Sequence, residues 1–127
     1  MIENGGDIFI KSTMRVKVGL YSSNSYFSDK LNIEFNAEQT PCGICSSSGS
    51  MGHSLSLGRS DLVTIMSDST ILADAAATAV ANSIKDQTDI EKAISQYKKN
   101  KEIKGMVIIK GDRIGIWGAM QLGSMEK

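Results

Sequence analysis

An alanine-rich stretch carries the polar residues of this sequence that are best placed for chemistry. Asp74, Thr78 and Asn82 recur at every fourth position between residues 73 and 82, so on a helix they lie along one face. A carboxylate and a hydroxyl one turn apart form a pair of hard oxygen ligands. Such a pair suits Mg²⁺, which takes few protein ligands and keeps water or phosphate oxygens in the rest of its shell. The alternative is a thin polar stripe in solvent, and the spacing leaves both open.

A run of small and hydroxyl residues forms a second candidate site. In Ser46-Ser47-Ser48-Gly49-Ser50 the backbone N–H groups could wrap a phosphate, because glycine permits close approach and the hydroxyls add donors. The run lacks the Gly-Lys-Ser/Thr ending of the phosphate loop of nucleotide triphosphatases. His53, the single histidine, follows and is a candidate general acid/base. A surface loop with a hydrogen-bonded histidine is the alternative.

Cys42 and Cys45 form a C-x-x-C pattern, which is found in redox and zinc sites. A redox pair is expected to open a helix, whereas glycine and serine residues follow this one. A structural zinc ion needs four ligands, so an acidic residue or a second subunit would have to complete two thiols and one imidazole. We therefore interpret the two cysteines as small buried thiols.

The composition predicts one neutral domain over residues 1–127. The chain has 127 residues, of which 41% are apolar, and 14 basic residues balance 14 acidic ones. This charge balance gives no electrostatic signature of a nucleic acid or an anionic membrane partner. No apolar run approaches the roughly twenty residues of a membrane span, and the start of the sequence lacks the pattern of a signal peptide. We therefore predict a cytoplasmic protein.

Alternating and apolar runs predict the elements that must position these residues. The strands are expected at Ile8–Lys11, Met14–Tyr21, Leu31–Phe35, Cys42–Cys45 and Leu62–Met66, followed by a hairpin of Met106–Ile109 and Ile114–Trp117. The first two strands are expected to pair with each other, Leu62–Met66 to be central, and the chain to fray beyond Leu122.

Two helices complete this prediction. The first runs from about Thr70 to Lys85, with Ser67, Asp68 or Ser69 as its cap, and the second opens with a capping box from Thr88 to Glu91. The element order predicts an α+β fold in which an antiparallel β-sheet carries two helices packed on one face.

Several motifs in order resemble the ApbE superfamily, and most closely its non-lipoprotein ApbE-like branch. They are Glu3-Asn4-Gly5-Gly6-Asp7-Ile8, Cys42-Gly43-Ile44-Cys45-Ser46-Ser47-Ser48-Gly49 with Gly52-His53-Ser54, Ala73-Asp74-Ala75-Ala76-Ala77-Thr78-Ala79, and Gly111-Asp112-Arg113-Ile114-Gly115-Ile116-Trp117-Gly118. The better-known relatives have a T-fold-like domain. They bind FAD, cleave its pyrophosphate with Mg²⁺ and attach FMN to a threonine of a partner protein.

The resemblance implies a role for each matching residue. Asp74 and Thr78 match the Mg²⁺ ligands of the A-D-x-x-x-T helix, and His53 matches a histidine beyond the flavin loop. The flavin nucleotide (FAD or FMN) would contact Gly5, Gly6 and Asp7 of the G-G-D turn and Ser46, Ser47, Ser48 and Gly49 of the loop. We expect Asp74 and Thr78 to face inward, across from that loop.

Two departures from the family pattern shape the functional prediction. His53 is followed by Ser54-Leu55 and not by the aspartate and proline of the transferases, and the family's G-G-D turn lies in mid-chain. The sequence therefore resembles a C-terminal half, and we expect a homo-oligomer to complete the site. We predict a flavin nucleotide-binding domain with a Mg²⁺-assisted pyrophosphate or FMN-transfer site and a protein acceptor. The alternatives are a non-catalytic nucleotide or pterin-like binding module, and a structural half-domain active only as an oligomer.

Overall fold

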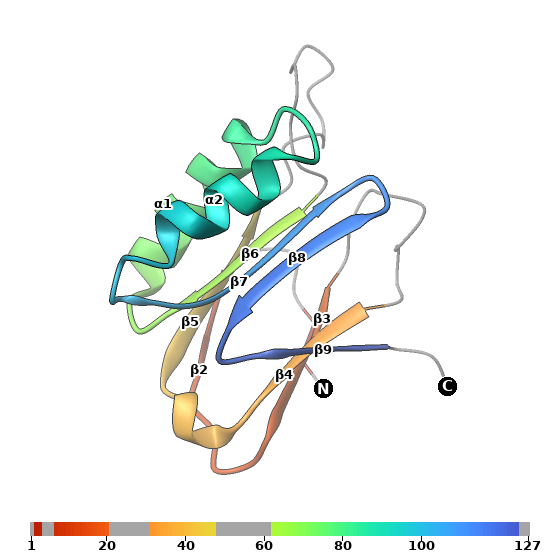
Figure 1. Cartoon of the computed structure of the whole chain (residues 1–127). Coiled ribbons are helices and arrows are strands. Elements are labelled where there is room, and N and C mark those ends of the chain that lie inside the picture. The colour runs from red at the N-terminus through yellow and green to blue at the C-terminus, as the bar shows by residue number, and fades with distance from the viewer. Residues whose placement is uncertain (1, 4–6, 21–30, 48–61, 125–127) are drawn as a thin grey trace.

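The computed structural model describes residues 2–3, 7–20, 31–47 and 62–124 (Figure 1). Within these ranges the chain forms, in order, β1 (Ile2–Glu3), β2 (Asp7–Ile10), β3 (Val16–Leu20), β4 (Leu31–Phe35), a short 3-10 helix η1 (Ala37–Gln39), β5 (Cys42–Ser47), β6 (Leu62–Ser67), α1 (Thr70–Ser83), α2 (Asp89–Tyr97), β7 (Ile103–Lys110), β8 (Arg113–Gly118) and β9 (Gln121–Ser124).

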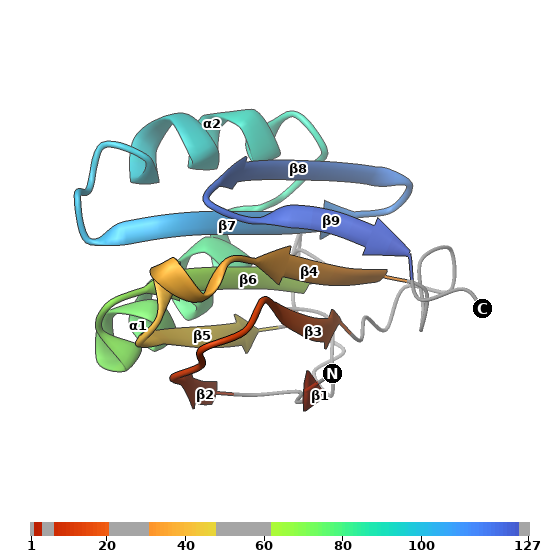
Figure 2. The same ribbon diagram turned by 90° about the horizontal axis from the view of Figure 1, so that it is seen from below.

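The strands form two sheets, which lie against each other. One has the order β2-β5-β6-β7-β8 and is antiparallel throughout, and the other has the order β1-β3-β4-β9. Both helices pack on one face of the five-stranded sheet, and the four-stranded sheet covers the other face (Figures 1 and 2). The α+β prediction is confirmed. The second sheet and the parallel pairing of β1 with β3 were not predicted.

Alternation along β6 explains the two cores. Val63 and Ile65 pack under the helices, whereas Leu62 and Met66 pack between the sheets. All six residues of β6 are buried, and the strand is third of five, so its predicted central position is confirmed. A nearly continuous apolar run, interrupted only by Thr64 between Leu62 and Met66, is typical of a strand covered on both faces.

Two pairing predictions are wrong. The strand that contains Ile8 pairs with β5 and not with β3, which belongs to the other sheet. The alternation of Ile8 and Ile10 marks an inward face, but the same face can be buried in either sheet. The prediction that the chain frays beyond Leu122 is also wrong. Strand β9 continues to Ser124 and pairs with β4, with Leu122 opposite Ile33.

The N-terminus of α1 confirms one of the predicted caps. Ser69 Oγ accepts a hydrogen bond of 3.1 Å from the backbone N–H of Leu72, and the extended backbone of Ser69 is the conformation that such a cap requires. The helix ends at Ser83, two residues before the predicted end.

The predicted capping box of α2 is wrong. Thr88 already has helical backbone angles (φ −71°, ψ −20°), so its side chain is not directed at the first turn; it bonds Asp86. Asp89 takes the opposite role, since its Oδ2 accepts from the backbone N–H of Lys85 at 2.8 Å and of Asp86 at 3.1 Å.

Candidate functional site

The helix-side face at the β2 edge of the five-stranded sheet brings together parts of two predicted motifs. Asp7 of the G-G-D turn lies directly opposite Cys45 in the β2–β5 pairing. Cys45 belongs to the core under the helices, so the side chains of Asp7 and, two residues further along β5, Ser47 are on that same face. β2 is the edge strand, and Asp7 is exposed there.

Helix α1 lies very close to β5. The Cys45 thiol donates a hydrogen bond of 3.4 Å to the backbone carbonyl of Thr70. A Cβ atom added at Gly43 would lie 2.6 Å from Thr70 Cα and 2.4 Å from its Oγ1, so only glycine fits beneath the first turn. Alanines make this approach possible, because Ala73, Ala76, Ala77 and Ala81 form most of the buried face of the helix.

The direction of α1 brings the polar residues Asp74 and Thr78 toward the C-terminal end of β5. β6 is antiparallel to β5 and α1 reverses direction after it, so α1 runs in the same sense as β5 (Figure 1). From Thr70 to Thr78 the helix rises about 12 Å. From Gly43 to Ser47 the strand advances about 13 Å. Thr78 is therefore level with Ser47, at the point where β5 leads into the predicted flavin loop.

The expectation that Asp74 and Thr78 face inward is wrong. Both side chains, and that of Asn82, are exposed on the flank of α1. Ala73 and Ala77 point into the sheet, and each following residue is turned by about 100° around the helix axis. Neither Asp74 nor Thr78 forms a side-chain hydrogen bond or ion pair within the described ranges. The predicted magnesium ligands are thus available to solvent, and their assignment stays a prediction.

The electrostatics of Cys45 show that two distant carboxylates converge. Burial raises the pKa of the Cys45 thiol to about 12, with further contributions from a hydrogen bond to Asp7 and from the negative charges of Asp7 and Asp74. Asp7 comes from the G-G-D motif and Asp74 from the A-D-x-x-x-T helix. The fold therefore places both motifs within electrostatic reach of one buried thiol.

The two cysteines do not form a joint site. Three positions apart on a strand, they point to opposite faces: Cys45 toward the helices and Cys42 into the core between the sheets. Burial raises the pKa of Cys42 to about 11, with a lowering contribution from Lys104 and a raising one from Asp68. Both thiols are buried, unpaired with each other and protonated at neutral pH, which confirms the interpretation as small buried thiols.

Comparison with known sequences identifies the family. A family model described as AbpE bacteria matches residues 1–112. The chain belongs to this family. Several relatives are named UPF0280 protein. One from Methanobrevibacter smithii is 38% identical, and the match covers 94% of this chain and 52% of the relative. One from Methanococcus maripaludis is 41% identical, and the match covers 89% of this chain and 47% of the relative. A third, from Methanocaldococcus jannaschii, is 36% identical, and the match covers 91% of this chain and 50% of the relative.

This AbpE bacteria family member spans about half the length of the curated relatives it matches. The names of those relatives state no ligand or reaction. Within the part of the chain that the structure describes, no helix is long and apolar enough to cross a membrane. In the same ranges, no three His, Cys, Asp or Glu side chains are grouped so that they could hold a metal ion.

The remaining predicted site residues divide into two groups. The side chain of Ser46 lies on the opposite face of β5 from that of Ser47, and its Oγ is 2.9 Å from Thr64 Oγ1. Strand alternation makes this separation unavoidable, since neighbouring residues cannot share a face. Gly5, Gly6, Ser48, Gly49 and His53 lie outside the described residues, so their roles stay predictions.

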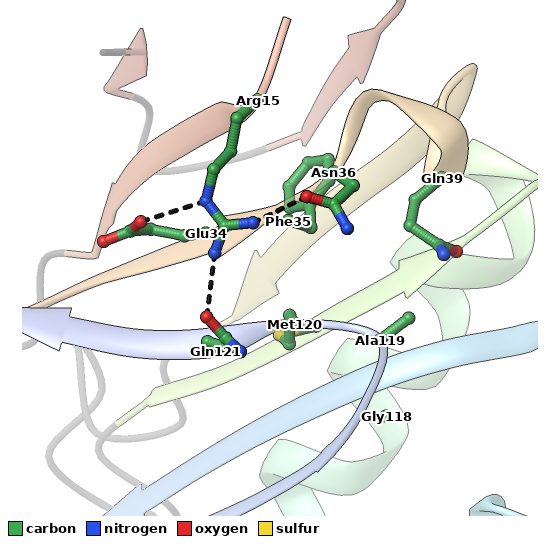
Figure 3. A pocket seen from close by; sticks show the side chains of 9 residues that line it. All are labelled: Arg15, Glu34, Phe35, Asn36, Gln39, Gly118, Ala119, Met120 and Gln121. Atoms are coloured by element: carbon green, nitrogen blue, oxygen red, sulfur yellow. Dashed lines mark hydrogen bonds and ion pairs between the residues drawn. The ribbon is translucent and has the colours of Figure 1, made fainter.

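A polar pocket that the sequence did not reveal lies at one end of the four-stranded sheet (Figure 3). Its volume is about 210 Å³, and it is lined by Arg15, Glu34, Phe35, Asn36, Gln39, Gly118, Ala119, Met120 and Gln121. The Arg15 guanidinium is its organising group: Nε donates to Glu34 Oε1 (3.3 Å), Nη1 to Asn36 Oδ1 (2.7 Å) and Nη2 to Gln121 Oε1 (2.8 Å).

Alternation was the available signal for this pocket. Val16 and Phe35 face the core between the sheets, so their neighbours Arg15 and Glu34 project from the outer face. The pattern could not reveal that Gln121 joins them, because this depends on β9 pairing with β4.

Proposed function

We propose that this chain binds a flavin nucleotide, FAD or FMN, on the helix-side face at the β2 edge, with Mg²⁺ held by Asp74 and Thr78. The observation that carries the proposal is that Asp7 lies opposite Cys45 of β5, and that α1, the helix of Asp74, sits directly on this strand. The resemblance to the ApbE superfamily selected these two motifs independently of any contact between them. Their convergence at an accessible edge is what a shared nucleotide site requires.

The donor set at this edge suits magnesium. Asp74 offers a carboxylate and Thr78 a hydroxyl one turn further along α1, and both are exposed and without side-chain partners in the described ranges. Hard oxygen donors of this kind match Mg²⁺, which keeps open positions for phosphate oxygens. When bound, the ion would neutralise charge on a pyrophosphate and so assist its cleavage. The proposal therefore includes a pyrophosphate or FMN-transfer reaction with a protein acceptor.

The chain's own residues would orient the nucleotide. Ser47 is level with Thr78 and on its side of the sheet, so its hydroxyl and the backbone N–H groups of the following Ser48-Gly49 are our candidates for holding phosphate oxygens. The raised pKa keeps Cys45 protonated, so the thiol adds no third negative charge beside Asp7 and Asp74. The local charge then comes from two carboxylates, which a divalent cation balances.

A second copy of the chain is part of the proposal. Phe9 lies opposite Gly43 on the helix-side face of the edge strand and is 62% exposed, and Ile71 on the exposed side of α1 is 84% exposed. Apolar side chains beside an open strand edge favour a covering partner. A homo-oligomer would bury them next to the carboxylates.

Fluorescence titration with FAD, with and without Mg²⁺, tests this proposal. We expect Mg²⁺ to tighten binding and Asp74→Ala to remove that effect, with Thr78→Val acting in the same direction. Glu91→Ala, which removes an exposed carboxylate from α2, is the matched control and should retain the effect. If Asp74→Ala retains it as well, the metal assignment fails.

Chromatography of the same mixtures separates catalysis from binding. Release of FMN that depends on Mg²⁺ and on Asp74 would support a pyrophosphate-cleaving site. Binding of FAD that leaves it intact in the presence of Mg²⁺ would instead select the non-catalytic binding module. Absence of FAD binding under all conditions would overturn the flavin proposal itself.

A further inference from the structure

The guanidinium of Arg15 fixes the orientation of two neighbouring amides in the polar pocket. Arginine carries donors only, so the groups that face it from Asn36 and Gln121 must be their carbonyl oxygens. Each amide then directs its NH₂ group away from the guanidinium. Figure 3 shows both amide nitrogens on the pocket side of these bonds. The arrangement turns two residues of mixed hydrogen-bonding character into donors toward the pocket.

The carboxylate of Glu34 also lines the pocket, beside this row of donors. Its Oε1 accepts from Arg15 Nε, and its Oε2 points along β9, since a Cβ atom added at Gly123 would lie 2.7 Å from it. Gly123 is on the far side of Gln121 from the pocket residues Ala119 and Met120. Glu34 therefore holds the guanidinium through Oε1 and directs its second oxygen toward Gly123, away from Ala119 and Met120.

Arg15 retains donors of its own. A guanidinium has five N–H groups, and the three bonds to Glu34, Asn36 and Gln121 use three of them. The remaining two are on Nη1 and Nη2, which form one edge of the planar group. A pair of parallel N–H donors on one edge matches the oxygen pair of a carboxylate or phosphate.

The opposite wall of the pocket is held in place by a separate contact. Lys104 donates from Nζ to the backbone carbonyl of Gln39 at 3.1 Å and pairs with Asp68 at 2.8 Å. Its charge is therefore committed elsewhere, and its role is to fix the η1 segment that carries Gln39.

From these contacts we propose that the pocket binds a small oxyanion, either a carboxylate or a phosphate group. The N–H groups of Arg15, Asn36 and Gln121 converge on it, and a volume of about 210 Å³ holds several times the roughly 30 Å³ that one water molecule occupies in the liquid. The site lies at one end of the four-stranded sheet, whereas the proposed flavin site lies on the helix side of the other sheet. The two proposals are independent.

Side-chain NMR titration at constant ionic strength tests the oxyanion site. The probes are inorganic phosphate and acetate, with chloride replaced so that screening does not change. We expect saturable shifts of the Arg15 Nε–H and of the NH₂ resonances of Asn36 and Gln121. Saturation with phosphate alone identifies a phosphate ligand, and saturation with acetate alone identifies a carboxylate. Absence of saturation with both probes overturns the proposal.

Gln121→Glu is the decisive variant, because it keeps an oxygen for Arg15 but replaces the NH₂ donor by a second oxygen. We expect binding at least tenfold weaker, with Asn36→Asp giving the same result if the first variant does not fold. Gln96→Glu makes the same change on the exposed side of α2 and should leave binding unchanged. Equal affinity of Gln121→Glu and the unmodified chain would show that the amide donors are not used.

Discussion

The two helices lie side by side on the same sheet but contact it in different ways (Figure 1). Beneath α1, the glycine at position 43 faces the backbone of Thr70, whose Cα would be 2.6 Å from an added Cβ. Beneath α2, Gly115 faces only side-chain ends, with Ile90 Cγ2 at 2.4 Å and Ile94 Cδ1 at 2.9 Å from such a Cβ. One helix meets the sheet through its backbone, and the other through the side chains of Ile90 and Ile94.

This difference explains where the candidate chemistry lies. α1 presents mainly alanine to the sheet, so its axis is close to β5 and its flank carries Asp74 within reach of Cys45. α2 uses isoleucine spacers, which hold its polar side further from the strands. Small residues are therefore the physical means by which a surface carboxylate of α1 approaches the sheet.

Gly43→Ala should have the largest effect on stability. The new methyl group meets the Thr70 backbone, so α1 as a whole must shift, and we expect a loss of about 3 kcal/mol, near the upper end of overpacking costs. Gly115→Ala meets isoleucine side chains and not helix backbone, so α2 can stay in place while these side chains adjust, and we expect a smaller cost of about 1 kcal/mol. Urea denaturation of both variants gives the two free energies of unfolding. Equal losses would show that the two helices are not seated differently.

Ser69→Ala compares the N-termini of the same helices. It removes the oxygen that caps Leu72 N–H, and we expect it to destabilise the fold by about 1 kcal/mol. Thr88→Ala should cost only a few tenths of that, roughly the value of an exposed polar contact, because Thr88 does not cap α2. The same denaturation experiment measures both. A larger loss of stability for Thr88→Ala than for Ser69→Ala would show that Thr88 caps α2 after all.

Local signals in the sequence predicted where the strands and helices lie better than they predicted which strands pair with each other. The nearly continuous apolar run of β6 marked the central strand, and the Gly111 turn between β7 and β8 has the positive φ (64°) that glycine adopts readily. The partner of β2 could not be predicted, since two inward-facing isoleucines satisfy either sheet. Pairing between distant strands depends on the whole topology and leaves no mark in a short window.

The candidate site was predictable as a set of motifs but not as a geometry. The spacing of four residues predicted that Asp74 and Thr78 lie on one face of α1, and in the structure they do. Which way the face points depends on how the neighbouring alanines pack, and here it points outward. The polar pocket was beyond prediction for a related reason: Arg15 and Gln121 meet only because β3, β4 and β9 are adjacent.

The two thiols of β5 should respond differently to alkaline pH. Each has a folded-state pKa above the ordinary value of 9.0, so the protonated form is favoured by folding. This contribution to stability is fully present below pH 9 and is lost as the pH rises toward about 11 for Cys42 and about 12 for Cys45. Cys45→Ala should therefore reduce the alkaline loss more than Cys42→Ala. At pH 10, below both folded-state pKa values, the two losses are still nearly equal, so the order shows only above about pH 11. Denaturation at pH 8 and at about pH 11.5 measures both, and the reverse order would contradict the assignment.

The smallest expected effect is the most direct test of the convergence at α1. The ¹³Cβ chemical shift of Cys45, followed by NMR in a Cys42→Ala background, reports the pKa of this thiol alone. Asp7→Asn should lower that pKa because it removes a charged hydrogen-bond acceptor, and Asp74→Asn should lower it less because it removes only a more remote charge.

Glu91→Gln is the control on α2, because Glu91 is not among the groups that raise the pKa of Cys45, and it should leave that pKa unchanged. A Cys45 pKa that ignores Asp74→Asn would mean that α1 does not hold this carboxylate close to β5. The close approach of α1 to β5 at Gly43 would then contribute to packing alone. The two helices would differ in how much their contacts with the sheet stabilise the fold, but not in bringing a carboxylate close to Cys45.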